Sequence, residues 1–272
     1  MSRKLATLML SLMLALPALA AGKRFEGIVE MRSREHTKMP FAGEQTRETT
    51  EITYYRPGMV KIVRQPDSRV TIIRADKEII WDIDLKNKTY TEMTFQDVAR
   101  LYAKMRARAR EMQAELAAQL QSLPPEQRKM AEQMAQSGSG RALEEAMQGN
   151  VRLVWKDTGE EAQVLGYTCR KYLGLLNEQP IIETWVTDAY DVGEELVATL
   201  KAYGLLGGDG KSEIQILHGL PLKTVTTVEL GAGSVHRVSE ATKVQEAKVA
   251  PSEFDLPAGL KKEKSPLEMM EE

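Results

Sequence analysis

Short segments in which apolar and polar residues alternate fill residues 25–93, and they constrain the fold more than any other feature. In the first segment Phe25, Gly27, Val29 and Met31 alternate with Glu26, Glu30 and Arg32, the period-2 pattern of a strand with one buried face. The breaks between segments have the length of hairpin turns, which join antiparallel neighbours. A meander of antiparallel strands is therefore predicted over residues 25–32, 52–55, 59–64, 69–74, 78–84 and 89–93.

The pattern changes at Thr94, where helical spacing replaces alternation. Thr94 and Asp97 resemble a capping box with aspartate in the place of the usual glutamate. Residues 94–149 are predicted to be a helical insertion, after which strands resume at residue 151 and continue to residue 245. The predicted fold class is α+β, with about ten antiparallel strands. The first helix of the insertion is indicated by apolar residues at helical spacing: Val98, Leu101, Met105, Met112, Leu116 and Leu120.

The first twenty residues have the pattern of an export signal. A basic start, an apolar run over residues 5–16 and a small-x-small ending predict cleavage between Ala20 and Ala21. Ala21 stands where an exported lipoprotein carries cysteine, so the mature protein is expected in the periplasm, soluble and without a lipid anchor. A single β-rich domain is expected over residues 21–260, followed by a charged, solvated tail over residues 261–272.

Charge and cysteine content limit the partners and the stabilisation of the fold. Removing the leader with Arg3 and Lys4 reduces the 37 basic residues to 35 against 39 acidic ones, which gives no reason to expect nucleic acid as a partner. Cys169 is the only cysteine, so an internal disulfide is excluded in spite of the oxidising compartment. Alternation around Cys169 predicts that it is a buried apolar residue.

No motif of an enzyme, a metal site or a cofactor site is found. His36, His218 and His236 lack a second ligand at metal-binding spacing, and only their clustering in one pocket would indicate an enzyme. Asp82 and Asp84 share a strand face, which is typical of a solvated edge. The sequence therefore predicts a non-enzymatic protein with no catalytic residue, metal ligand or cofactor.

The helical insertion has two features with alternative interpretations. Its methionines either pack on the sheet or close over an apolar cavity as a lid, since methionine adapts to varied apolar partners. Five basic residues on the first helix either form a solvated surface or make peripheral contact with an anionic membrane: Arg100, Lys104, Arg106, Arg108 and Arg110.

Several phrases resemble those of a family of exported bacterial proteins classed as a domain of unknown function. They include Gly166 to Tyr172 (GYTCRKY), Glu183 to Thr187 (ETWVT) and Glu253 to Gly259 (EFDLPAG), and together the matching phrases span residues 50 to 260. The family is similar in layout to the Lol-type periplasmic lipoprotein carriers. The resemblance implies a curved antiparallel sheet that forms a half-open barrel, with residues 94–149 as a lid.

Two functions are expected on these grounds. The first is a monomeric carrier or binder of an apolar or lipid-like ligand. The second is a structural or interaction protein that docks an envelope protein through the helical insertion. For the carrier, the expected cavity walls and lid residues are Ile79, Trp81, Ile83, Trp155, Trp185, Met105, Met112 and Leu116.

Overall fold

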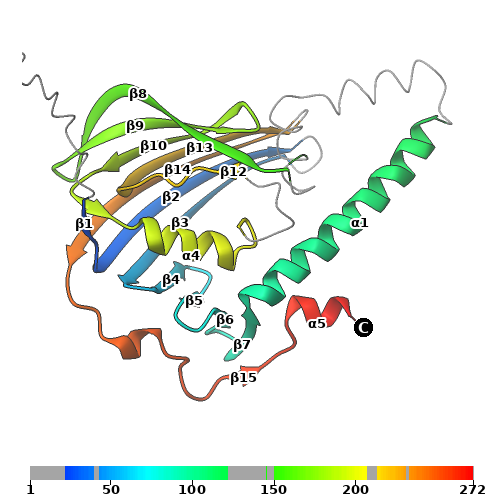
Figure 1. Ribbon diagram of the computed structural model, residues 1–272, viewed down its shortest axis with the longest axis horizontal. Helices are drawn as coiled ribbons and strands as arrows, with labels where there is room; N and C mark the ends of the chain where they lie inside the picture. Colours follow the sequence, from blue (N-terminus) through cyan, green and yellow to red (C-terminus); the bar gives the residue numbers. More distant parts are fainter. Residues whose placement is uncertain are drawn as a thin grey trace, which may run out of the picture.

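The structure, a computed structural model, consists mainly of one large curved sheet with the α-helices on one side (Figure 1). It describes residues 22–39, 43–121, 145, 150–206, 213–230 and 233–271. The expected cleavage site at Ala20 and Ala21, the side chains of Met112 and Leu116, and most of the insertion beyond the first helix lie outside the described part.

The strands are β1 (Lys23–Arg24), β2 (Gly27–Met39), β3 (Gly43–Arg56), β4 (Met59–Gln65), β5 (Arg69–Arg74), β6 (Ile79–Asp84), β7 (Thr89–Thr94), β8 (Arg152–Val164), β9 (Tyr167–Leu176), β10 (Gln179–Thr187), β11 (Tyr190–Asp191), β12 (Glu213–Ile214), β13 (Leu220–Leu230), β14 (Gly233–Glu246) and β15 (Lys261–Lys262). The helices are α1 (Phe95–Gln121), α4 (Gly193–Ala202), the 3-10 helix η1 (Pro251–Phe254) and α5 (Pro266–Met270).

The antiparallel sheet predicted from the alternation is confirmed, but it is larger and more open than expected. Thirteen strands follow the order β12-β8-β9-β10-β13-β14-β2-β3-β4-β5-β6-β7-β15, and β1 with β11 forms a separate two-stranded sheet. Within the described residues the large sheet ends at β12 and β15 and does not close, so the half-open barrel and the count of about ten strands are corrected. Strands β1, β11 and β15 were not predicted because two residues are too few to show a period. The first part of β3, residues 43–51, was not predicted because it is polar on both faces.

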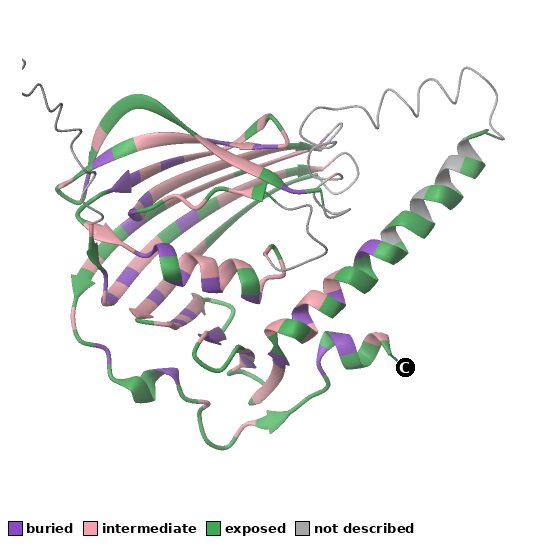
Figure 2. Ribbon diagram, in the orientation of Figure 1, coloured by how far each residue is buried: buried purple, intermediate pink, exposed green. Residues whose placement is uncertain are grey.

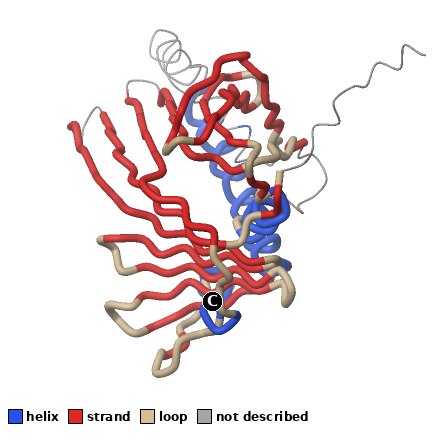
Figure 3. Tube along the Cα trace, turned by 90° about the vertical axis from the view of Figure 1, so that its left-hand side faces the viewer, coloured by secondary structure: helices blue, strands red, loops and turns tan. Residues whose placement is uncertain are grey.

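Helices α4 and α1 lie on the concave face, as the view along the sheet in Figure 3 shows. The capping box at the start of α1 is confirmed, with Thr94 N–H donating to Asp97 Oδ2 over 2.9 Å and Asp97 N–H to Thr94 Oγ1 over 3.0 Å. At this end of the sheet, a filled core takes the place of the apolar cavity expected beneath the insertion. The core joins both helices to strands β4 to β7 and consists of Val60, Ile62, Ile73, Ile80, Met93, Val98, Leu101, Ala198, Ala202 and Leu267.

The C-terminal segment covers the convex face of the same strands. Phe254, which is fully buried, packs with Val249 against Ile72, Trp81 and Ile83. The solvated tail predicted over residues 261–272 instead forms β15, which pairs with β7, and α5, whose Leu267 enters the core under α1. Helix α5, which starts with a capping box at Ser265, was not predicted because the charged residues around it indicated a solvated tail.

A third cluster closes the end of the sheet near β1 and β11. It contains Phe25, Val192, Leu222 and Cys169, which confirms the predicted burial of the cysteine. Burial raises the pKa of the Cys169 thiol, so the side chain remains a neutral apolar group.

Candidate ligand-binding site on the concave face

Polar side chains occupy the part of the concave face that α4 does not cover. Directly paired residues of neighbouring strands present their side chains on the same face. Thr226 of β13, Arg237 of β14, Glu35 of β2 and Arg47 of β3 therefore form one row across four strands. The adjacent row consists of Thr224, Ser239, Ser33 and Thr49 in the same order of strands.

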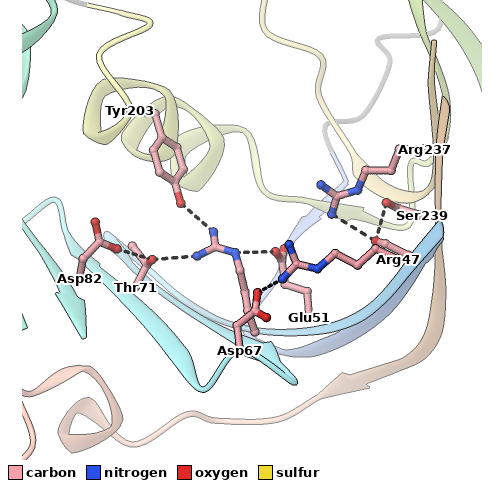
Figure 4. Close-up of polar contacts among 10 residues, drawn as sticks. Arg47, Glu51, Asp67, Thr71, Asp82, Tyr203, Arg237 and Ser239 are labelled. Atoms are coloured by element: carbon pink, nitrogen blue, oxygen red, sulfur yellow. Dashed lines mark hydrogen bonds and ion pairs between the residues drawn. The ribbon is translucent and has the colours of Figure 1, made fainter. Parts of the chain in front are cut away.

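Hydrogen bonds connect the two rows (Figure 4). The guanidinium of Arg237 donates to Ser33 Oγ over 3.2 Å, and the hydroxyls of Ser33 and Ser239 are 2.7 Å apart. Arg47 forms an ion pair with Asp67 at the turn after β4. Each of these side chains is thereby held in place before any ligand arrives.

Arg64 connects the polar surface to helix α4. Its guanidinium donates to Tyr203 Oη over 2.9 Å and to Thr71 Oγ1 over 3.1 Å, and its Nε lies 3.3 Å from Glu51 Oε2. Although burial opposes the charged form, Tyr203 and Glu51 raise the pKa of Arg64 above its ordinary value. Arg64 is therefore a charged structural link between the pocket and the end of α4.

These side chains enclose a pocket of about 210 Å³. Its charged residues are three arginines and three carboxylates, but the pairing is uneven. Arg47 and Arg64 each have a carboxylate partner. Within the part of the chain that the structure describes, neither Arg237 nor Glu35 has an ion-pair partner, although they are directly opposite in register. The pocket is lined by Glu35, Arg47, Thr49, Thr50, Glu51, Arg64, Asp67 and Arg237.

Partly exposed apolar side chains border the pocket. Val228 and Val235 are paired and lie two residues beyond Thr226 and Arg237 on the same face. Ile182 of β10 is paired with Thr226 and continues the border toward β9. The pocket thus combines a charged centre with an apolar margin.

The residues expected to line one ligand cavity are not brought together. Trp81 and Ile83 lie in the convex core with Phe254, and Ile79 packs against that core. Met105 is 47% exposed on α1, beyond the part of the helix that packs on the core.

The other two tryptophans make separate local contacts. Trp155 packs near Gly174 and donates from Nε1 to the carbonyl of Gln215 over 3.0 Å. Trp185 lies beneath the amines of Lys171 and Lys223, which are 5.2 and 5.4 Å from its ring. Neither ring reaches the concave pocket as part of its lining.

Sequence reasoning missed the central residues of the pocket, Arg237, Glu35 and Arg47. About two hundred positions separate Arg237 from the other two, and only the pairing of β14 with β2 brings them together. A signal was present in the alternation of Ser33, Glu35 and Thr37, which makes one strand face polar where an apolar core face would be expected.

The three histidines are divided between two places. His36 and His236 are directly paired across β2 and β14, whereas His218 lies 3.2 Å from Asp191 Oδ2. They do not share one pocket. Among the described residues, no group of three or more His, Cys, Asp or Glu side chains is placed to hold a metal ion.

The basic residues of α1 are only partly available to a membrane surface. Arg100 pairs with Asp97, and Lys104 with Glu271 over 2.6 Å. Arg106 is buried, whereas Arg108 and Arg110 are exposed. From Ala103 to Gln121 the described side chains of α1 are exposed apart from Arg106, as the colouring of the helix in Figure 2 shows. No helix in the described part of the chain is long and apolar enough to span a membrane.

No family model matches the sequence, and no curated protein sequence matches it either. Solved structures similar to this chain include an uncharacterized conserved protein from Thermus thermophilus, at 7% identity and a TM-score of 0.41 over 91% of this chain and 93% of that one. A LolA superfamily protein from Nitrosomonas europaea aligns at 8% identity and a TM-score of 0.33, over 88% and 94% of the two chains. MucB, in a complex with MucA(peri), aligns at 12% identity and a TM-score of 0.31, over 86% of this chain and 56% of that chain. Similarity at this level supports no statement about the activity of this chain.

Proposed function

We propose that the protein is a non-enzymatic binding protein of the cell envelope that takes a lipid-like amphiphile on its concave face. The observation that carries the proposal is the pair Arg237 and Glu35, two opposite charges without an ion-pair partner among the described residues, in a pocket with an apolar margin. A phosphate or carboxylate would bind the guanidinium, and an ammonium group would bind the carboxylate. The favoured head group is therefore zwitterionic.

The apolar part of the ligand would lie along the margin of the pocket. Val228, Val235 and Ile182 are partly exposed, so covering them removes apolar surface from water. The pocket volume of about 210 Å³ suits a head group, whereas the chain would extend over the open sheet. This arrangement differs from the cavity expected under the helices, which side chains fill at α4 and the start of α1.

Binding of a lysophosphatidylethanolamine with a twelve-carbon chain, below its micelle concentration, tests the proposal by isothermal titration calorimetry. Arg237→Gln and Glu35→Gln are each expected to weaken binding about tenfold, the equivalent of one charge-assisted hydrogen bond. Val235→Ser is expected to weaken binding of the twelve-carbon ligand and to leave binding of the chain-free head group unchanged.

Lys243→Gln is the matched control for the charge changes. Lys243 is an exposed cation on the same strand as Arg237, but it stands opposite Glu30 in the strand register and therefore lies on the convex face. Its loss should leave the affinity unchanged. The proposal fails if the wild-type protein does not bind the lysolipid, or if dodecyl maltoside, with its uncharged head, binds equally well.

A second candidate function is docking of an envelope protein through the helical insertion. The specific observation in its favour is that α1 continues to Gln121, far beyond Leu101, its last residue in the core. Met105, one turn after Leu101, is exposed.

A deletion variant tests this function. Replacing residues 107–148 with a Gly-Ser linker keeps Val98 and Leu101 in the core. The docking function predicts that this variant melts like the wild type and loses a partner crosslinked in the periplasm, with lysolipid binding retained. Unchanged crosslinks would exclude it.

A further inference from the structure

The convex face carries a row of four side chains that the proposed function does not use. Thr227 of β13, His236 of β14, His36 of β2 and Thr46 of β3 are paired in register, each with the next. Side chains of directly paired residues share a face, with Cβ atoms about 5 Å apart. The two histidines are therefore neighbours, and a threonine stands on each outer side.

Each histidine ring is oriented by a hydrogen bond to the threonine on its outer side. His36 Nδ1 lies 3.2 Å from Thr46 Oγ1, and His236 Nδ1 lies 3.0 Å from Thr227 Oγ1. Each Nδ1 thus has its hydrogen bond on the side away from the other histidine. Among the described residues neither Nε2 has a hydrogen-bond partner, so both can bind a shared ligand. A histidine that binds a metal through one ring nitrogen commonly donates a hydrogen bond from the other, and here each threonine can accept that bond.

The surroundings of the pair suit a cation. The His36 side chain is 45% exposed and His236 is exposed, so water can complete the coordination. The neighbouring cations are already paired, Arg34 with Glu48 over 2.6 Å and Lys38 with Glu44 over 3.3 Å. Glu44 Oε2 also lies 3.9 Å from His36 Nε2 and adds negative charge beside the pair.

We propose that His36 and His236 form a two-histidine site for a late first-row divalent metal ion such as Zn²⁺ or Cu²⁺. Imidazole nitrogen is a preferred ligand of these ions, whereas Mg²⁺ and Ca²⁺ prefer oxygen. Water molecules occupy the remaining positions. The site lies on the opposite face of β2 and β14 from the concave pocket, so it is independent of lysolipid binding.

Calorimetric titration of the untagged mature chain with ZnCl₂, after removal of metals with EDTA, tests the site. One Zn²⁺ per chain is expected, and His36→Gln and His236→Gln should each lower the association constant at least tenfold. His218→Gln is the control and should leave binding unchanged, because His218 lies beside Asp191 and not in the row. Thr46→Val retains both ligands and should weaken binding about tenfold through the lost orientation of His36.

Electron paramagnetic resonance with one equivalent of Cu²⁺ gives a second readout. The wild-type protein should show nitrogen splitting from two imidazoles, and each single variant should show splitting from one. The site is refuted if either histidine variant binds Zn²⁺ like the wild type, or if His218→Gln weakens binding as strongly as they do. Melting temperatures of the variants without metal should match the wild type, because both rings are exposed.

Discussion

Replacing Phe254 with alanine is expected to lower the free energy of unfolding by about 3–5 kcal/mol. Phe254 is fully buried between the C-terminal segment and the convex face, where it contacts the cluster of Ile72, Trp81 and Ile83. The substitution removes the transfer free energy of the ring and leaves a cavity that the sheet cannot fill. Urea denaturation followed by circular dichroism measures the loss.

Glu253→Gln is the neighbouring control. Glu253 is 47% exposed and pairs with Lys61 on the surface, so a loss of less than about 1 kcal/mol is expected. An equally small loss for Phe254→Ala would show that the C-terminal segment does not cover the sheet.

Phe254→Ala also distinguishes the two possible locations of the ligand. The affinity for the lysolipid should not change if the ligand lies on the concave face. It should change if Ile79, Trp81 and Ile83 line the cavity.

Replacing Gly219 with alanine is expected to cost about 3 kcal/mol from two sources, backbone strain and steric overlap. Gly219 has φ +112°, which a residue with a Cβ rarely adopts. An added Cβ would lie 2.4 Å from Val186 Cγ1 and 2.7 Å from the carbonyl oxygen of Thr187. Because one obstacle is backbone, relief requires a shift of β10, and the Gly219 N–H would also move from Asp191 Oδ1, now 3.1 Å away.

Gly159→Ala separates the two sources. Gly159 has φ +74°, but no atom lies within 4 Å of an added Cβ, so only the strain of about 1 kcal/mol should appear in urea denaturation. A similar loss for both variants would show that the contact of Gly219 with Thr187 is not rigid. The larger expected loss at Gly219 therefore tests the packing of β10 against the start of β13.

Local patterns were sufficient for much of the fold. Strands β4 to β7 and the start of α1 were predicted because alternation, hairpin turns and the pair Thr94 and Asp97 are all encoded within a few residues. The polar part of β3 was missed because neither of its faces enters an apolar core. The tail was missed because charged lysines precede the capping serine and the buried Leu267.

Alternation also predicted which residues share a strand face, but it could not assign that face to one side of the sheet. Trp81 and Ile83 share a face as expected, yet their partner is Phe254 and not the helical insertion. A period of two gives two equivalent faces, and the choice between them depends on which distant segment packs against each. In this protein α4 and α1 cover one face, and residues 249–260 of the C-terminal segment cover the other.

The sequence by itself determined the strand-rich fold class, the position at which the helical insertion begins and the burial of Cys169. These features follow from periodicity, capping and composition, which act over short distances along the chain. Only the tertiary structure decided that the sheet formed by the described residues stays open with thirteen strands and that side chains fill the space under α4. It also decided that Arg237 faces Glu35 while His236 faces His36. Both of these pairs depend on the register of β14 against β2. That register is set by contacts between segments about two hundred residues apart, so it cannot be predicted from the sequence of either strand alone.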